Sequence, residues 1–490
     1  MTFARDVVDA ADPAALAMVE LTRDGRRREW SFGEVAAVSA ALAARFAGLG
    51  IQQGDVVMTL IGNRPEWVVT MVACFRIGAV ALPCNEQLRP ADLRARLDAA
   101  SPRLVVADAR NRAVLDEAKP DCEVVGFEGP EWIDQLLAES TDGCAEGQPW
   151  SELPPEAPAL ITFTSGTTGS AKGIVHGQRY LSGQRLQAEH WLGAAPRDLV
   201  WCTAASGWSK SARNVFIAPG LRGAAALLHD GRFDPDERLE LLARERVNVL
   251  CMAPTEYRVI AKRAELRRYP ELRQLVAAGE ALNPEVLRAW REATGLEIRD
   301  GYGQTETGQL TGNPPGEPAR PGSMGKPLPG VALQIIDGEL VLNDPHSDPT
   351  FFVGWLGGEP APLDRPWHTG DLVTADADGY LHFQGRNDDL IISAGYRIGP
   401  FEVESALVSH PAVAEAAVVA APDDERGSVV RAVVVLRNAY TGSEELVREL
   451  QEHVQAETAP YKYPRLIEFV DELPKTASGK IQRARLRDVR

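Results

Sequence analysis

The sequence predicts an α/β protein: a large N-terminal domain of doubly wound α/β subdomains plus a β-rich subdomain, followed by a small α+β C-terminal domain. Strand and helix patterns alternate through the first part of the chain. The stretches 312–330 and 343–366 are rich in Pro and Gly, which favours short strands and loops. After Gly385 an alternating pattern restarts and lasts about a hundred residues, enough for a separate domain. The predicted domains are therefore 1–385 and 386–490.

Individual elements follow from local signals. Ser31 is predicted to be the N-cap of a helix over 32–47 that closes at Gly48 and Gly50, and DVVMTLIG (55–62) follows as a strand. Further along the chain, the predicted elements are a strand over ALITF (159–163), a helix near 177–192 and a buried strand over VNVLCMAP (247–254).

Composition limits the function classes. At 490 residues with 44% apolar content, the chain exceeds what one hydrophobic core usually serves. Its net charge of -17 argues against a nucleic-acid binder. The six cysteines lie far apart without a CxxC pair, which favours reduced thiols over a disulfide or zinc framework. They are Cys74, Cys84, Cys122, Cys144, Cys202 and Cys251.

The sequence gives no signal for a membrane span or a targeting segment. The apolar stretch from Val68 to Cys84 is broken by Arg76, and no uncharged run reaches the length of a spanning helix. The N-terminus, MTFARDVVDAAD, is acidic and lacks an apolar h-region. These features predict a cytoplasmic protein.

TSGTTGSAKG (164–173) has the composition of a polyphosphate cradle. Glycines let backbone N–H groups approach an anion, hydroxyl groups add donors, and Lys172 adds positive charge. The loop departs from a Walker motif at Ala171 and Gly173. A flexible turn without a ligand is the alternative. The predicted phosphate-binding residues are Thr164, Ser165, Gly166, Thr167, Thr168, Gly169 and Lys172.

Further motifs follow in a fixed order. They are AAGEALNPE (277–285), DGYGQTETG (300–308), WHTGD (367–371), GRNDDLIISAGYRIGPFEVE (385–404) and PKTASGKIQR (474–483). With the glycine-rich loop, they make the chain resemble the adenylate-forming superfamily of acyl-CoA synthetases, carrier-protein adenylation domains and luciferases. The string SAGYRIGPFEVE and APYKYPR (459–465) look most like the medium-chain acyl-CoA synthetase branch.

The resemblance implies a two-step reaction. A carboxylate attacks the α-phosphorus of ATP and releases pyrophosphate; the thiol of CoA then displaces AMP. Because an anion approaches an anionic phosphate, the site must neutralise charge. Glu306 matches the family's Mg²⁺-binding glutamate and Lys480 its catalytic lysine. The alternatives are a solvated loop carboxylate and a surface lysine.

The same resemblance assigns nucleoside contacts. Asp371 would accept hydrogen bonds from the ribose hydroxyls with help from Arg386, and Tyr302 would face the adenine unless it is a core tyrosine. The other residues expected around the nucleotide are Gly279, Glu280, Ala281, Asp300, Gly301, Gly303, Gln304 and Thr305.

Two half-reactions at one site imply a mobile C-terminal domain. By resemblance Asp388 is the hinge, and rotation exchanges the Lys480 loop for the SAGYRIG face, where Gly395 gives the pantetheine arm room. Ala394 and Ser428 depart from the branch pattern, so CoA binding is less securely indicated than adenylation. The expected CoA contacts are Gly395, Tyr396, Arg397, Arg426 and Lys462.

The acyl pocket is expected around Trp208, Gly303, Gly308 and Gln309. In acetate-specific relatives a tryptophan aligned with Gly303 closes the pocket, so glycine predicts room for a medium-length or aryl acid. A tight backbone turn at Gly303 and a core role for Trp208 are the alternatives. Ala205 stands where the branch tends to carry an acid.

The sequence therefore predicts an ATP-dependent acyl-CoA synthetase acting on a medium-chain or aromatic carboxylic acid, with ATP, Mg²⁺ and CoA. Two alternatives stay open: an adenylating enzyme that loads a separate carrier protein, and a nucleotide-binding regulatory protein that has lost catalysis.

Overall fold

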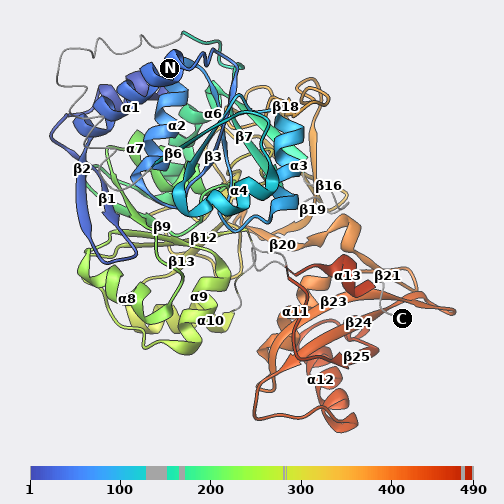
Figure 1. Cartoon of the computed structure of the whole chain (residues 1–490). Helices are drawn as coiled ribbons and strands as arrows, with labels where there is room; N and C mark the ends of the chain where they lie inside the picture. The colour runs from blue at the N-terminus through green and yellow to red at the C-terminus, as the bar shows by residue number, and fades with distance from the viewer. Residues whose placement is uncertain are drawn as a thin grey trace.

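Alternating apolar strands and amphipathic helices build the N-terminal part from two packed sheets (Figure 1). The structure is a computed structural model that describes residues 2–127, 152–164, 172–279, 282, 284–475 and 481–487. Within these ranges the doubly wound α/β class predicted from sequence is confirmed.

One sheet has seven strands in the order β18-β8-β7-β4-β3-β5-β6. Its central strands run parallel, while β8 and β18 pair antiparallel at one edge. The strands are β3 (Val56–Leu60), β4 (Val80–Pro83), β5 (Leu104–Asp108), β6 (Glu123–Phe127), β7 (Pro158–Thr164), β8 (Lys172–Gly177) and β18 (Gly354–Trp355), and the helices of this region are α2 (Pro65–Ile77), α3 (Pro90–Ala100) and α4 (Arg112–Ala118), with the turn η2 (Ala109–Asn111).

The second sheet has nine strands in the order β15-β14-β13-β12-β11-β9-β10-β1-β2. Its strands are β1 (Leu16–Leu21), β2 (Arg27–Ser31), β9 (Leu199–Cys202), β10 (Ala225–His229), β11 (Val249–Met252), β12 (Gln274–Ala278), β13 (Ile298–Tyr302), β14 (Thr311–Gly312) and β15 (Lys326–Pro327). Its helical segments are η1 (Ala4–Asp9), α1 (Phe32–Gly48), α6 (Gln178–Gln187), η3 (Ala188–Leu192), η4 (Arg213–Ile217), α7 (Ala218–Leu221), α8 (Pro235–Arg244), α9 (Pro254–Arg263) and α10 (Pro284–Thr294).

The two sheets share one hydrophobic core. Buried side chains from β3, β4 and β5 of the first sheet and from β9, β10 and β11 of the second cluster with α1, α2 and η4 between them. Separate clusters cover the outer face of each sheet, one with α8 to α10 and one with α3 and α4. Helices therefore pack on both faces of both sheets, the layering that doubly wound sheets require.

The predicted β-rich region forms between and after the two Pro- and Gly-rich stretches. Four strands make an antiparallel sheet in the order β16-β17-β19-β20. They are β16 (Leu333–Ile336), β17 (Glu339–Leu342), β19 (Trp367–Ala375) and β20 (Leu381–Arg386). This sheet leads directly into the C-terminal part of the chain.

The C-terminal part has its own buried core, separate from the N-terminal clusters. It lies below the N-terminal part in Figure 1. It contains a two-stranded and a three-stranded sheet. Its elements are η5 (Asn387–Asp389), β21 (Ile391–Ser393), β22 (Tyr396–Ile398), α11 (Pro400–Ser409), β23 (Val413–Asp423), β24 (Gly427–Leu436), α12 (Glu444–Glu457), η6 (Pro460–Lys462), β25 (Leu466–Phe469) and α13 (Arg483–Arg487).

The predicted single elements agree with the structure at most positions. The helix expected over 32–47 is α1, and the strand expected over 159–163 lies within β7. The helix expected near 177–192 divides into α6 and the π-helical turn η3. No described helix is long and apolar enough to cross a membrane.

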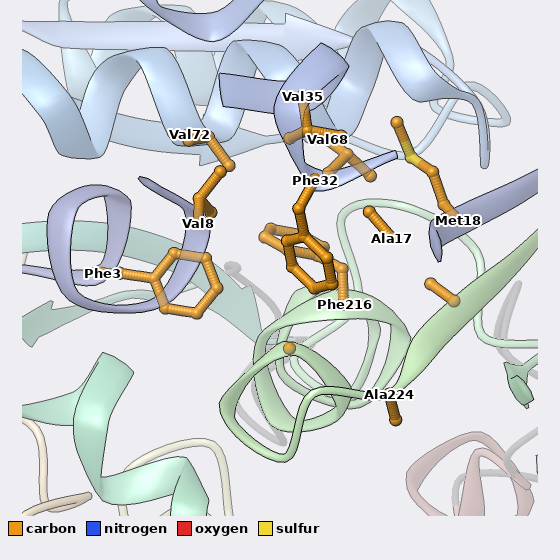
Figure 2. Close-up of a pocket in the computed structure, with 12 residues that line it drawn as sticks. Phe3, Val8, Ala17, Met18, Phe32, Val35, Val68, Val72, Phe216 and Ala224 are labelled. Atoms are coloured by element: carbon orange, nitrogen blue, oxygen red, sulfur yellow. The ribbon is translucent and has the colours of Figure 1, made fainter. Parts of the chain in front are cut away.

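A small apolar cavity of about 30 Å³ lies where the N-terminal segment packs on the shared core (Figure 2). Phe3, Val68 and Phe216 are among its lining side chains, and all twelve lining residues are apolar. A space of this size with no polar partner is a packing gap that offers nothing to a charged ligand.

Ser31→Ala is expected to lower the free energy of unfolding by about 1 kcal/mol. The Ser31 hydroxyl accepts the Glu34 N–H at 3.1 Å, and the Glu34 carboxylate accepts the Ser31 N–H at 2.8 Å. Denaturant unfolding measures the change. Glu34→Gln keeps a side-chain oxygen at the same position and should cost less; an equal or larger loss would contradict the capping role.

Candidate active site

The predicted nucleotide residues meet at the carboxyl ends of parallel strands. β12 ends at Ala278, just before Gly279, and its neighbour β13 ends at Tyr302, just before the loop carrying Gln304 and Glu306. The carboxyl edge of a doubly wound sheet is where such folds place ligands. The sequence predicted that these residues lie around one nucleotide. The parallel register of β12 on β13 brings the ends of the two strands side by side.

A tight turn joins β13 to β14. The Gly308 N–H donates to the Gln304 carbonyl at 3.1 Å, and the Leu310 N–H donates to the Tyr302 carbonyl at 2.8 Å. A Cβ at Gly303 would overlap the Gly308 carbonyl oxygen, and one at Gly308, where φ is 68°, would meet Thr350 at 2.8 Å. These contacts support the tight-turn alternative. That these glycines border the acyl pocket stays a prediction.

Four side chains form a hydrogen-bond network across two sheets. The Tyr302 hydroxyl donates to Asp371 Oδ2, and Gln304 Nε2 donates to the same oxygen at 2.9 Å. Gln304 also donates to the Thr369 carbonyl at 2.6 Å and accepts from Trp367 Nε1 at 3.1 Å. The network fixes the buried Asp371 carboxylate of β19 against the end of β13.

Arg386 and Asp388 lie beside this network. Arg386 pairs with Asp371 in the register of β19 on β20. Its Nε donates to Asp388 Oδ1 at 3.0 Å. Burial works against the charged guanidinium, but the carboxylates of Asp371 and Asp388 raise the pKa of Arg386 overall. The predicted ribose partner and the predicted hinge are therefore in direct contact.

Glu306 lies in the same turn, largely enclosed by protein. Burial raises the pKa of its carboxyl, while the charges of Arg386 and Lys172 work in the opposite direction. The Glu306 carbonyl accepts the Phe352 N–H at 2.8 Å. Lys172 opens β8 directly opposite Thr164 of β7. The predicted Mg²⁺ residue and the predicted phosphate lysine thus belong to one electrostatic environment.

Sequence reasoning did not single out Lys210, which the structure brings to the site. Its ammonium donates to the Ala278 carbonyl at the end of β12, and a Cβ at Gly279 would overlap it. It also acts electrostatically on Asp300, where burial raises the pKa to about 8 and the Lys210 charge opposes that shift. The signal was a lysine two residues after Trp208 in the string SGWSKSARNVF, in a chain with few lysines.

The loop carrying Trp208 is held against the other sheet. The Ser206 hydroxyl donates to the Ile61 carbonyl, and Asn63 Nδ2 donates to the Ala204 carbonyl at 3.0 Å. Gly207 has φ 86°, and a Cβ there would meet the backbone of Cys84. Trp208 itself is half-buried, so it is not a core tryptophan.

The remaining acyl residue of the sequence prediction, Gln309, is 2% exposed. Its Nε2 donates to the Thr311 carbonyl at 2.9 Å, and its Oε1 has no partner in the described part of the chain. It lies under the turn beside Gly301 rather than at an open surface.

The predicted CoA residues gather at one end of the C-terminal sheets. Gly395 has φ 84° and open space around its Cα, and Tyr396 stacks on Tyr461 with ring centroids 4.3 Å apart. The Ala394 N–H donates to the Arg426 carbonyl at 3.0 Å. Lys462 is already engaged, because its ammonium donates to Glu402. Arg397 pairs through its backbone with Ile392.

Some predicted site residues lie outside the described residues. They are Ser165, Gly166, Thr167, Thr168, Gly169, Glu280, Ala281 and Lys480. Their expected roles stay predictions.

Residues 5–346 match the model of the AMP-binding enzyme family, and residues 402–480 match the model of the AMP-binding enzyme C-terminal domain. The chain belongs to the AMP-binding enzyme family. Three similar proteins illustrate the match.

An acyl-CoA ligase of Bacillus subtilis called YtcI, itself uncharacterised, is 40% identical over 94% of this chain and 91% of its own. The mitochondrial acyl-coenzyme A synthetase ACSM4 of Mus musculus is 40% identical over 99% and 90%. The crystal structure of the anthranilate CoA ligase AuaEII in complex with anthranoyl-AMP superposes with a TM-score of 0.85, at 29% identity, covering 99% of this chain and 96% of that one.

The residues present fit the family's nucleotide and metal. The Asp371 carboxylate is a fixed acceptor for hydroxyl groups, and Glu306 lies beside the cations Arg386 and Lys172. Among the described residues no group of three or more His, Cys, Asp or Glu side chains could hold a metal ion. The Glu306 carboxylate suits Mg²⁺, which typically takes one or two carboxylates and completes its shell with substrate phosphates and water.

Asp300→Asn is expected to flatten the pH dependence of stability. An unfolded Asp ionises near pH 4, whereas native Asp300 keeps its proton to about pH 8. Because the native state holds this proton and the unfolded state does not, the wild-type free energy of unfolding should fall as pH rises from about 5 to about 8. Asn does not titrate, so the variant's Tm should fall less.

Thermal unfolding at both ends of that pH window measures the effect. Glu425→Gln, which replaces an exposed carboxylate, is the matched control and should leave the wild-type slope unchanged. Parallel Tm profiles for wild type and Asp300→Asn would show that Asp300 ionises normally in the native state.

Proposed function

We propose that this protein is an ATP-dependent acyl-CoA synthetase for a medium-chain or aromatic carboxylic acid. As a member of its family it is an AMP-forming acid–CoA ligase that uses ATP, Mg²⁺ and CoA. The observation that carries the proposal is the fixed Asp371 carboxylate with Tyr302 on one side and Arg386 on the other. The acid's identity comes from the resemblance to the medium-chain branch and from relatives such as the anthranilate CoA ligase.

The first step joins the substrate carboxylate to AMP. A carboxylate oxygen forms a bond to the α-phosphorus, and the bond to the pyrophosphate oxygen breaks. Asp371 would accept hydrogen bonds from the ribose hydroxyls, and Tyr302 would lie against the adenine. Mg²⁺ held through Glu306 would supply positive charge at the phosphates. Lys172, together with the hydroxyl-rich loop that precedes it, would orient the triphosphate.

The second step breaks the bond between the acyl carbon and AMP. The CoA sulfur attacks the acyl carbon, its proton is released, and AMP leaves with the bonding electron pair. We place the boundary between the two domains after residue 385 and the hinge at Asp388. Rotation there would exchange Lys480, which acts in adenylation, for the Gly395 turn, where CoA would enter.

Arg426 and Tyr396 lie around the Gly395 turn and support CoA as the acceptor. A separate carrier protein as acceptor is the second candidate, since such a protein presents the same pantetheine thiol. The described cysteines are all free thiols, which fits the cytoplasmic location that we expect.

Exchange of labelled pyrophosphate into ATP across a panel of acids tests the proposal, with CoA added in a second step. We expect exchange without CoA and acyl-CoA formation with it. Exchange that leads to no acyl-CoA would favour the carrier-protein candidate, and no exchange with any acid would favour a regulatory nucleotide-binding protein.

Lys480→Ala should abolish adenylation, by at least about a hundredfold, because the lysine would neutralise charge at the reacting phosphate. Thioester formation from a supplied acyl-adenylate should change little. Lys475→Ala is the matched control: that lysine precedes the same loop and pairs with Glu415 at 2.9 Å, so both half-reactions should persist. Equal loss of both half-reactions in Lys480→Ala would contradict the rotation.

Asp371→Ala should raise the KM for ATP by at least about tenfold, because two ribose hydrogen bonds to a charged acceptor are lost. The KM for the carboxylic acid should move less. Asp376→Ala changes a carboxylate at the other end of the same hairpin and serves as control. An unchanged KM for ATP in Asp371→Ala would rule out the ribose contact.

A further inference from the structure

A cluster of buried polar side chains lies directly beneath the turn that carries Glu306. We call it the buried polar cluster. Its members come from β8 and α6, which follow one another in the chain, and from η4 further along. They are His176, Tyr180, Gln184, Gln187, Arg213 and Asn214, each 4% exposed or less.

Contacts tie the buried polar cluster together and to the active site. The rings of His176 and Tyr180 stack with centroids 3.9 Å apart, and Gln187 Nε2 donates to Asn214 Oδ1 at 2.9 Å. Arg213 acts electrostatically on His176 and Tyr180, and the His176 ring lies beside the Thr305 backbone of the turn.

Arg213 also lies near the strand ends that frame the site. Its charge acts on Cys251 near the end of β11, whose neighbour Cys202 ends β9. Arg213 comes five residues after Trp208. It is the first residue of η4, the helical turn that follows the loop carrying Trp208. The cluster thus adjoins both the Glu306 turn and the segment that follows Trp208.

Several polar atoms of this cluster have no hydrogen-bond partner in the described part of the chain. Unpartnered buried groups are costly, and native interiors contain few of them. The atoms are both ring nitrogens of His176, Oε1 of Gln184, Oε1 of Gln187, Nε and Nη1 of Arg213, and Nδ2 of Asn214.

Two other deeply buried arginines have carboxylate partners. Arg76 makes two bonds of 2.7 Å to Asp9, and Arg238 pairs with Glu256 at 3.2 Å. Arg299 donates to the Asn313 carbonyl at 2.9 Å and, among the described residues, has no carboxylate partner. Arg213, 3% exposed, has no carboxylate partner among the described residues either, and its side chain hydrogen-bonds to Tyr180.

The neighbours of Arg213 do not balance its charge. Burial and the Arg213 charge lower the pKa of His176 to about 3, so the imidazole is neutral at physiological pH. Tyr180 is neutral as well, because burial raises the pKa of its hydroxyl. The cluster therefore carries one net positive charge that only an anion from outside the described chain would offset.

We propose that Arg213 binds a second anionic group, a carboxylate, at the distal end of the acyl substrate, so that the preferred substrates are dicarboxylic acids. A guanidinium presents paired donors that match a carboxylate, and the amide and imidazole groups around it supply further hydrogen bonds. This inference rests on the proposed function. The apolar cavity lined by Phe216 (Figure 2) offers no such partner.

Matched pairs of acids test the proposal: butyrate with succinate, hexanoate with adipate, and benzoate with terephthalate. In wild type, kcat/KM for the best dicarboxylate should exceed that for its monocarboxylate partner by at least about tenfold, as expected for a charged hydrogen-bonded contact. Arg213→Met should reverse that preference, and Arg213→Lys should retain part of it.

Arg76→Met is the control, because it removes a buried arginine whose partner is known. It should lower Tm and leave the acid preference unchanged. Arg213→Met removes a side-chain hydrogen bond to Tyr180 but strands no buried carboxylate, so its Tm should fall less than that of Arg76→Met. A fall in Tm as large as that of Arg76→Met, with unchanged preference, would make Arg213 a structural residue and overturn the proposal.

The panel also separates this proposal from the function on which it rests. If no acid supports pyrophosphate exchange in wild type, the proposed function fails and the inference fails with it. If monocarboxylates react and no dicarboxylate is preferred, the synthetase stands and only the Arg213 inference is overturned. The wild-type result alone decides this point should Arg213→Met not fold.

Discussion

The hydrogen bonds from Tyr302 and Gln304 to Asp371 are the interaction on which the site depends. They join the end of β13 in the nine-stranded sheet to β19 in the β-rich sheet, two structures that share no backbone ladder. This link fixes the position of the Asp371 carboxylate relative to the turn that carries Glu306. A buried acceptor held by two donors loses little freedom when a ligand arrives, which is the physical meaning of a preorganised site.

Close backbone approach makes that link possible. The β13–β14 turn brings Gly303 against the Gly308 carbonyl, so the chain reverses tightly enough to aim Tyr302 and Gln304 at one oxygen. Glycine at 303 thus serves the geometry of the turn that carries the nucleotide residues.

The buried and half-buried arginines of the protein have different surroundings, and these surroundings indicate different roles. Arg76 and Arg238 are buried with carboxylates and hold elements together. Arg386 lies between two carboxylates and faces the nucleotide region. Arg213, like Arg299, is buried without an acid in the described part of the chain, a costly arrangement that in our proposal a substrate carboxylate offsets at Arg213.

The sequence by itself determined the α/β class, the N-cap at Ser31 and the strand before the glycine-rich loop, because these depend on local patterns. It also determined the grouping of Tyr302, Glu306, Asp371 and Arg386, because these residues belong to motifs in a fixed order. Only the tertiary structure decided what each side chain touches. The Lys210 bond to Ala278 and the contacts of Arg213 with His176 and Tyr180 involve partners distant in the chain. The spacing of residues along the sequence does not predict such contacts, because they form only when the sheets pack together.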